Sequence, residues 1–542
     1  VYFTSSDAHI ANLEPLMRKT SSSNNLLSYF SNANKLDNNV NDGIQYTPVS
    51  SSTKINILST QFNGEKTSNF TKSKNKYQNL KLKLESTQKI WDEPRPTWLR
   101  ISDDLYLYSA FWDPRDLVEG GPVARVLGII RYNKDMMVKE YGVRKTGFIK
   151  DDWLPYSCYL WYKSHRTVGQ LKAFMFEEGL KAYVGTYFLC YPTNNTDNTT
   201  KQIDASETPY AVSIFPKNVT DYPNKIIYLI NNYKESKGNL INVHNILVNR
   251  TSVKSDNSSF INADVSVCVR ALFGPYDDIQ GMVQFISYYN IILGIKHFYF
   301  YELAVSSRVR KWFSILKNFD IHVHLLPWNL PTGNWEELWD FGSLTAINDC
   351  NYRSAGRHKF TIFVDLDEFL VPKAEIKSIH HMYQQILKHK RGTFGDTALI
   401  PNVFFCEEFE DFQNNKESID EQQKNATKGE DIFPIFKYTK REGRLWPPKV
   451  RSKMIVVPDT VISVGHHMVH HFVKKDFSNR ASPKLFSALH HYRSCEGLRH
   501  GIHATGSKVL DTTTVNDKSI FKFKSKVMGS ALVQSYKLMK EI

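Results

Sequence analysis

The feature that most constrains the fold is an alternation of strand-like and helix-like segments between residues 265 and 364. Short apolar runs at 297–301 and 360–364 are typical of buried strands. Between such runs, apolar side chains recur at helical spacing, and one such stripe consists of Met282, Phe285, Ile286, Tyr289 and Leu293. This order of strands and helices predicts an α/β fold with a mainly parallel sheet and crossover helices.

An acidic triplet, Asp365-Leu366-Asp367, follows the predicted strand at 360–364 directly. In an open parallel sheet, ligands bind beyond the carboxyl ends of the strands. Alternate residues of an extended chain point to the same side, so the two aspartates would share one side. Acidic triplets are common in solvated surface turns, but apolar runs flank this one on both sides. Because carboxylates are good ligands for Mg²⁺ and Mn²⁺, we predict a divalent-cation site here.

Composition divides the rest of the chain. Residues 1–88 are dominated by Ser, Asn, Lys and Thr and have too little apolar surface to bury, which predicts a disordered stem. Residues 89–261 carry strand-like runs between polar loops, which predicts a β-rich accessory domain. The alternating segments fall in a predicted catalytic domain at 262–510, followed by a C-terminal tail at 511–542.

Charge and glycosylation motifs indicate the partners and the compartment. The formal net charge of +14 is spread along the chain without a compact Lys/Arg block, which argues against a nucleic acid partner. A membrane-spanning helix needs about 20 apolar residues, and no run of that length occurs. We expect an N-terminal membrane anchor upstream of Val1, as in a type II membrane protein of the Golgi lumen. The glycosylation motif N-x-S/T favours the secretory pathway, and it occurs at Asn69, Asn194, Asn198, Asn218, Asn249, Asn257 and Asn425.

The cysteines are even in number and contain no C-x-x-C pair, which argues against a zinc ribbon or a thioredoxin-like site. They are compatible with three disulfides, whose pairing the sequence leaves open. The six residues are Cys158, Cys190, Cys268, Cys350, Cys406 and Cys495.

Several spaced motifs between about residues 108 and 493 resemble glycosyltransferase family 92. The most specific is the segment 363–369, which contains the acidic triplet and is followed by Pro372. Two departures from the family pattern are Ala271, where the family usually has Pro, and Val457, where it often has Arg. The other similar motifs are the aromatic Ser-Ala block at 108–115, Cys268-Val269, the aromatic run at 298–301, Asn348-Asp349-Cys350, the run 453–458, Gly465-His466-His467 and the segment 490–493.

The resemblance implies a GT-A-type nucleotide-sugar-binding domain and an inverting galactosyltransferase. It implies UDP-galactose as the donor, Mn²⁺ (or Mg²⁺) as the cofactor, and the core fucose of N-glycans as an acceptor, with formation of a β-linkage. A homodimer stays open as an alternative to a monomer.

Under this interpretation, Asp367 holds the metal with Asp365 beside it. A further ligand is expected from a histidine in the C-terminal part of the domain, with His467 as the first candidate and His491 as the second. The alternative for either histidine is a structural or surface role.

Other side chains are candidates for the remaining steps. Arg270, Lys453 and Arg451 could contact the donor diphosphate, because basic groups complement a leaving nucleotide. Glu408 lies in the acidic run 407–411 and is the candidate general base that deprotonates the acceptor hydroxyl. The competing interpretation of that run is a solvated acidic surface.

Two other function classes compete with this hypothesis. A metal-dependent nucleotidyl or phosphoryl transferase could use the same kind of sheet, although the sequence has no Walker P-loop. A non-catalytic lumenal sugar-binding protein could retain the fold without turnover, and the departures at Ala271 and Val457 keep that alternative open.

Overall fold

The computed structural model describes most of the chain from residue 97 onward, and all of these residues belong to one compact unit. The predicted stem at 1–88 and the motifs at Asn69, Asn194, Asn198, Asn257 and Asn425 lie outside the described residues. The domain boundaries at 89–261, 262–510 and 511–542 stay predictions. The described residues are 97–133, 146–163, 165–177, 181–193, 207–218, 225–233, 241–252, 265–332, 337–373, 376, 378–409, 433–484, 486–495 and 509–540.

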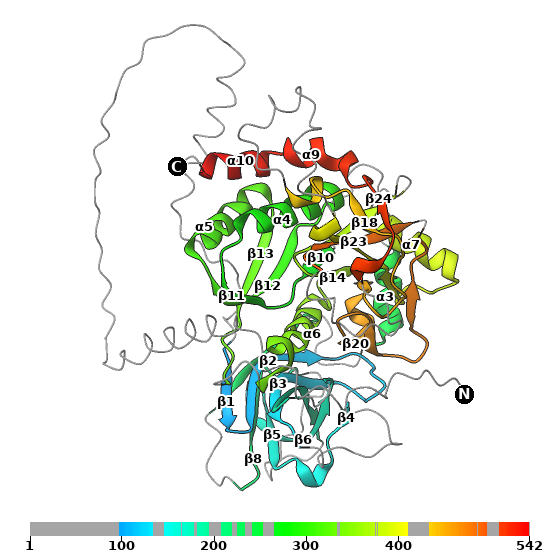
Figure 1. Ribbon diagram of the computed structural model, residues 1–542. Coiled ribbons are helices and arrows are strands. Elements are labelled where there is room, and N and C mark those ends of the chain that lie inside the picture. The colour runs from blue at the N-terminus through cyan, green and yellow to red at the C-terminus, as the bar shows by residue number, and fades with distance from the viewer. Residues whose placement is uncertain are drawn as a thin grey trace, which may run out of the picture. The chain divides into compact units, whose positions relative to one another are not determined.

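The first sheet closes on itself as a mixed barrel of seven strands (Figure 1). Its neighbours pair antiparallel except at the closure, where β9 pairs parallel with β2, and the short strands β1 (Leu99–Ser102) and β4 (Gly147–Phe148) pair outside the ring. Closure leaves the ring without an exposed edge. Around the ring, the strands are β2 (Leu105–Asp113), β3 (Val123–Arg131), β7 (Tyr183–Pro192), β6 (Arg166–Met175), β5 (Tyr156–Trp161), β8 (Ala211–Pro216) and β9 (Ile227–Ile230).

The second sheet is mixed. Strand β12 is parallel to β10, β11 and β13, and β10 is parallel to β14. Strand β19 lies between β14 and β16 and runs antiparallel to both, while β16 and β22 are parallel. The order is β11 (Leu272–Tyr276), β12 (His297–Val305), β10 (Val265–Cys268), β14 (Phe360–Phe363), β19 (Lys453–Val456), β16 (Thr397–Ile400) and β22 (Asn479–Ala481), with β13 (His322–Pro327) beside β12.

The predicted fold class, a mainly parallel α/β domain of GT-A type, is therefore wrong. Strands predominate, the barrel is closed, and antiparallel pairs interrupt the second sheet. The prediction relied on the segments before Asp365, where helices connect successive strands. Apolar periodicity indicates that a strand exists but does not give the direction in which it pairs. The antiparallel partner β19 comes about 90 residues after β14, and its sequence does not indicate the direction in which it pairs.

Helix α4 (Ile279–Leu293) shows why the local predictions succeeded. The Asp278 side chain accepts a hydrogen bond from the Gly281 N–H at the start of the helix. Gly294 ends it with φ of 69°, a conformation that glycine adopts without steric cost. The apolar stripe between these residues is buried in the main core. The other helices are α3 (Val243–Ser252), α5 (Ser307–Leu316), α6 (Ser343–Ser354), α7 (Ile379–Lys390), α9 (Lys524–Met528) and α10 (Ala531–Lys540).

Helix α6 is entirely buried and contacts both sheets: β3 and β7 of the barrel, and β10 and β14 of the mixed sheet (Figure 1). Its Asp349 accepts hydrogen bonds from Ser109 of the barrel, from Tyr301 of β12 and from Arg353. One buried carboxylate therefore connects the barrel, the helix and the mixed sheet.

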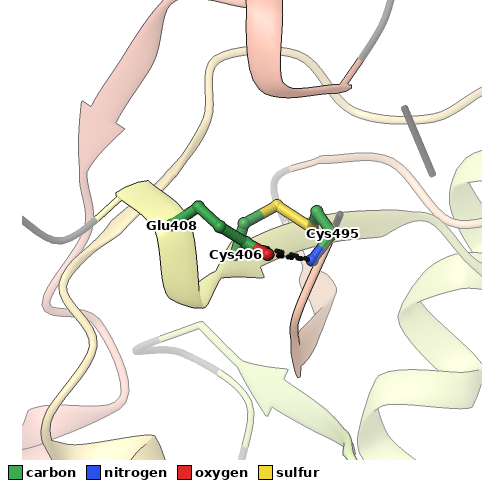
Figure 2. A group of neighbouring side chains, drawn as sticks. All are labelled: Cys406, Glu408 and Cys495. Carbon is green, nitrogen blue, oxygen red and sulfur yellow. Dashed lines mark hydrogen bonds between the residues drawn. A yellow bond between two sulfur atoms is a disulfide. The ribbon is translucent and has the colours of Figure 1, made fainter. Parts of the chain in front are cut away.

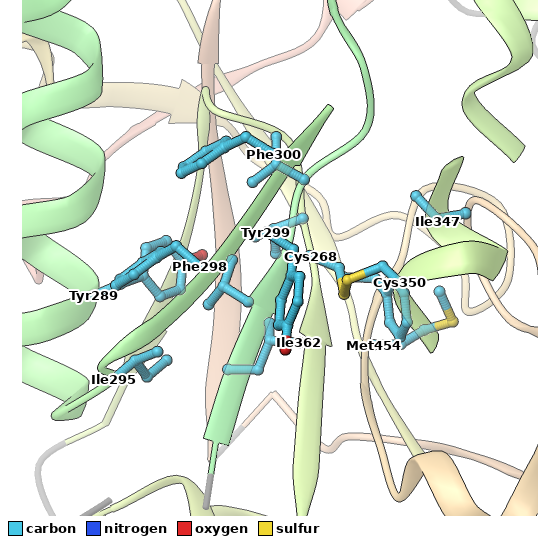
Figure 3. Packing of buried hydrophobic residues seen from close by; sticks show 14 of the residues in the cluster. Cys268, Tyr289, Ile295, Phe298, Tyr299, Phe300, Ile347, Cys350, Ile362 and Met454 are labelled. Atoms are coloured by element: carbon cyan, nitrogen blue, oxygen red, sulfur yellow. A yellow bond between two sulfur atoms is a disulfide. The ribbon is translucent and has the colours of Figure 1, made fainter. Parts of the chain in front are cut away.

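A third sheet, β15 (Glu368–Pro372), β23 (Ser487–Arg493) and β17 (Asn402–Cys406), begins directly after the acidic triplet. Among the described residues, no helix is long and apolar enough to cross a membrane. Three disulfides join Cys158 to Cys190 in the barrel, Cys406 to Cys495 at the ends of β17 and β23 (Figure 2), and Cys268 of β10 to Cys350 of α6 inside the main core (Figure 3).

Candidate active site

The acidic triplet forms the turn by which the chain leaves the mixed sheet and enters the third sheet. Strand β14 ends at Phe363, and β15 begins at Glu368. The backbone N–H of Asp365 donates to Glu368 Oε2 at 2.8 Å, and the N–H of Glu368 donates back to the Asp365 carbonyl at 3.1 Å. These two bonds close the turn and hold three carboxylates, those of Asp365, Asp367 and Glu368, near one another.

Two cations hold Asp365. Lys453 of β19 places its Nζ 2.9 Å from Oδ2, and Arg270, just after β10, places its Nε 3.1 Å from Oδ1. Burial by itself would raise the pKa of Asp365, but Lys453 and Arg270 outweigh it and keep the pKa well below its usual range. Asp365 is therefore ionised, and its charge positions two cationic side chains.

Asp367 pairs with His491 instead. The distance from His491 Nε2 to Asp367 Oδ2 is 3.0 Å, and the other ring nitrogen lies 3.4 Å from Glu368 Oε1. This contact follows from strand register, because Glu368 of β15 lies opposite His491 of β23. Burial opposes ionisation of Asp367, but His491 lowers its pKa below the usual value. The Asp367 side chain is 41% exposed, against 17% for Asp365 and 2% for Glu368.

A cavity of about 500 Å³ lies beside this turn, and His491 is part of its wall. Cationic side chains outnumber acidic ones in the lining, so the cavity favours an anionic ligand. The lining comprises the cations Lys181, Arg270, Arg451, Lys453 and Arg493, the acids Asp340, Asp365 and Glu368, and Leu338, Trp339, His466, His467 and His491.

The structure thus brings together most of the predicted site residues. Arg270, Lys453 and Asp365 are in direct contact, and Arg451 shares the cavity wall with them. Burial lowers the pKa of Arg451, and the neighbouring Arg493 adds to this effect. Their proposed roles in binding a donor stay predictions.

The two candidate histidines differ in their surroundings. His491 contacts Asp367, whereas His467 lines the cavity with its Nδ1 3.2 Å from the Ser452 carbonyl oxygen. Burial and the nearby Lys453 lower the pKa of His467 to about 3, so this imidazole is neutral at physiological pH. The geometry favours His491, the second candidate, as the partner of Asp367.

Glu408 is not in the cavity lining. It lies beside Cys406 and Cys495 instead (Figure 2). Both of its carboxylate oxygens lie 3.0 Å from the backbone nitrogen of Cys495, which donates to them, and Oε1 also accepts from Ser494 Oγ at 2.6 Å. Cys406, Glu408 and Cys495 lie close together, but both sulfurs are bound in a disulfide and offer no thiolate to a metal. Glu408 therefore fastens a loop in this structure.

Asp340 is a residue of this site that was not predicted from the sequence. Its Oδ2 accepts from Arg270 Nη1 and from Ser343 Oγ, each at 2.8 Å, so it orients the arginine that contacts Asp365. Asp340 and Phe341 have φ of 46° and 56°, which is rare for residues other than glycine. No local sequence pattern predicts that conformation. Glu368, by contrast, adjoins the acidic triplet and could have been found from its position.

An acidic turn with paired cations beside a basic cavity is typical of enzymes that transfer groups from phosphate-activated donors. Residues 263–529 match the model of glycosyltransferase family 92. A curated relative, the β-1,4-galactosyltransferase galt-1 of Caenorhabditis elegans, is 35% identical over 121 residues. That match spans 21% of this chain and 27% of the relative.

Among solved structures, TarS 1–349 of S. aureus is 12% identical, with a TM-score of 0.21, over 43% of this chain and 60% of that one. Its complex with UDP is 11% identical, with the same TM-score, over 51% and 75% of the two chains. Because the identities and TM-scores are this low, we infer nothing about this chain from these structures.

Proposed function

We propose that the chain is an inverting galactosyltransferase that moves galactose from UDP-galactose to a glycan, forming a β-linkage. The observation that carries the proposal is the contact of Asp365 with Lys453 and Arg270, next to the Asp367–His491 pair, at a basic cavity. The name of the C. elegans relative supports galactose as the sugar. As the acceptor we propose the core fucose of N-glycans.

The residues at the turn fit a bound Mn²⁺ or Mg²⁺. Asp367 offers a carboxylate oxygen, which suits Mn²⁺ or Mg²⁺, and His491 would add an imidazole nitrogen. Glu368 lies against the other ring nitrogen of His491, as the carboxylates that orient metal-binding histidines do. When bound, the ion would neutralise charge on the diphosphate of the donor.

The side chains of the cavity supply the other parts of the proposed reaction. Arg270 and Lys453, held by Asp365, bind the donor diphosphate together with Arg451 and Arg493 of the same cavity and stabilise it as it leaves. The acceptor hydroxyl attacks the far side of the anomeric carbon while the bond from that carbon to the diphosphate breaks, so the configuration inverts and the hydroxyl proton passes to a base. We do not assign its proton to Glu408, whose oxygens already accept hydrogen bonds from Ser494 and Cys495.

We also propose a lumenal location. Three disulfides are typical of proteins that fold in an oxidising compartment. Asn218, the first residue of one motif, is exposed beyond the end of β8, where a glycan could be attached. The test compares wild type with Asn218→Gln, both secreted from cells and treated with a glycosidase. Wild type should lose the mass of one more glycan than the variant.

The function is tested by incubating the purified chain with Mn²⁺, a core-fucosylated N-glycan, and UDP-galactose, UDP-glucose, UDP-N-acetylglucosamine or GDP-fucose in turn. We expect UDP-galactose alone to add one hexose to the glycan, detected by mass spectrometry and removed by a β-galactosidase. Transfer from another donor would correct the sugar. Donor and glycan binding without transfer from any donor would favour the non-catalytic sugar-binding alternative.

A further inference from the structure

A second cavity, of about 540 Å³, adjoins the first one, and Trp339, His466 and His467 line both. The barrel supplies another part of its wall, through Phe176 and Glu177 at the end of β6. The two cavities are therefore neighbours, and the second lies between the barrel and residues of the segment 263–529. The rest of its lining is Thr146, Leu344, Lys449, Met468, His470 and His471.

The second cavity differs in charge from the first. Its formally charged lining residues are Lys449 and Glu177, in place of the five cations that line the first cavity. Burial lowers the pKa of His471, and burial together with Lys453 lowers that of His466 to about 4, so these imidazoles are neutral. Neutral imidazoles both donate and accept hydrogen bonds, as hydroxyl groups require. The lining suits an uncharged, hydroxyl-rich ligand better than a diphosphate.

Trp339 presents an aromatic ring at the wall between the cavities. It is 45% exposed, so its ring is accessible to a ligand. The chain beyond it holds Asp340, Phe341 and Gly342 in the left-handed region, with φ of 46°, 56° and 68°. The Trp328 Nε1–H donates to the Phe341 carbonyl at 2.9 Å and holds that conformation. Such strain persists where the surroundings enforce it, and it is concentrated at binding sites.

Glu177 has an unused hydrogen-bonding capacity beside the same cavity. It is 3% exposed, and its Oε2 accepts from the Gly185 N–H at 2.8 Å. Its Oε1 is buried and has no hydrogen-bond partner among the described residues, and the same holds for Oγ1 of Thr345. A Cβ at Gly185 would lie 2.5 Å from Thr345 Oγ1, so these groups pack closely. Buried polar atoms normally have partners, which points to a hydrogen-bonding group that the ligand brings.

We propose that the second cavity is the subsite for the glycan acceptor, with Trp339 stacked on a sugar ring and Glu177 hydrogen-bonded to a sugar hydroxyl. The inference rests on the proposed function and adds that the barrel is part of the acceptor site. The shared wall then places the acceptor hydroxyl next to the donor sugar in the first cavity. Neither residue is given a role in bond breaking.

The test compares Trp339→Ala and Glu177→Gln with wild type, using the core-fucosylated N-glycan as acceptor and UDP-galactose as donor. We expect the KM for the glycan to rise about tenfold in each variant, the loss expected for one contact to a sugar. The Kd for UDP, measured by calorimetry, should change far less. Matched controls are Trp153→Ala and Glu207→Gln, on the barrel but outside both cavities, which should keep the wild-type KM.

Other outcomes separate this inference from the proposed function. Turnover with an unchanged glycan KM in both variants, whose melting temperatures match wild type, would overturn the subsite and leave the galactosyltransferase standing. Equal weakening of UDP and glycan would assign the second cavity to the nucleotide and also overturn it. If no donor supports turnover, saturation-transfer NMR with the glycan alone still tests the subsite. Glycan contact signals that are lost in Trp339→Ala would support it. Contact signals that are kept in both variants would exclude it.

Discussion

Two buried ion clusters of this protein differ in how completely their members are enclosed. In the barrel, Asp113 and Arg115 share two hydrogen bonds of 2.7 Å, and both residues are at most 1% exposed. At the acidic turn, Asp365 and Arg270 keep 17% and 33% of their side chains exposed, at the edge of a cavity. The first cluster leaves no room for a ligand, while the second borders a cavity. Of the two, the second can therefore contact a substrate.

The closed cluster uses its remaining capacity to join parts of the fold. Arg115 Nη1 donates to the carbonyl oxygens of Asp459 and Val461 at 2.9 and 3.2 Å, more than 300 residues away in sequence. Burial opposes the charge of Asp113, but Arg115 outweighs that effect and lowers its pKa. Buried ion pairs seldom add net stability, but removing one partner is costly. We therefore expect substitutions in the closed cluster to lower stability and substitutions in the open cluster to lower activity.

The largest effect on stability is expected from Asp113→Ala. The change leaves the guanidinium groups of Arg115 and Arg125 without their shared carboxylate, and we expect the free energy of unfolding to fall by about 3–5 kcal/mol. Urea denaturation measures it. Asp103→Ala, at an exposed pair with Arg100, is the control and should cost less than about 1 kcal/mol. Equal effects of the two changes would refute the contrast between closed and exposed ion pairs.

Lys453→Met tests the open cluster. Asp365 and Glu368 lose their common cation, so repulsion at the turn and a missing diphosphate contact should lower kcat/KM by about 100-fold. Steady-state kinetics of folded protein, checked by circular dichroism, measures it. Lys296→Met, which removes an exposed pair with Asp320, should leave kcat/KM unchanged. A decrease below about threefold for Lys453→Met would contradict a role of this cluster in chemistry.

The two histidines of the cavity sharpen the comparison further. His491→Ala should raise the Mn²⁺ concentration for half-maximal activity by about 10–100-fold, because it removes the partner of Asp367. His467→Ala should raise it much less, since the contact it makes is with the Ser452 carbonyl. Activity measured over a series of Mn²⁺ concentrations distinguishes them. The reverse order would restore His467 as the ligand.

The smallest effect concerns Glu177 and pH. Burial raises its pKa to about 8, above the usual value of 4.5, so the folded protein keeps the proton to higher pH. The stability that this group contributes is complete below about pH 4.5 and is lost as the pH rises towards about 8. Glu177→Gln should remove that dependence, measured by urea unfolding at pH 5 and pH 8. An unchanged dependence would show that another group causes it.

How far the sequence predicts the site depends on the range of the interactions that build it. The boundaries of α4 follow from a nearby cap, a stripe and a glycine, and all three are local. Asp365 and Lys453 carry charged side chains in recognisable motifs, so their chemistry could be predicted before their contact was known. That contact depends on the antiparallel pairing of β14 with β19, which apolar periodicity does not encode.

The histidine that meets Asp367 shows the same limit. His490 and His491 are neighbours in the sequence, but their side chains alternate across strand β23. Only the register, with Glu368 opposite His491, brings the second of them to the turn. Asp340 could not be found because its left-handed backbone is imposed by tertiary packing, not by its own preference.

The central claim is that the open cluster at the acidic turn carries out metal-dependent sugar transfer. The most direct measurement is Mn²⁺-dependent UDP release from UDP-galactose by wild type, Asp367→Ala and Asp476→Ala, whose carboxylate is exposed and contacts only His244 among the described ion pairs. We predict release by wild type and Asp476→Ala, abolished by EDTA, and a loss of about 1,000-fold or more in Asp367→Ala. Release by folded Asp367→Ala at the wild-type rate, or release unaffected by EDTA, would contradict the claim.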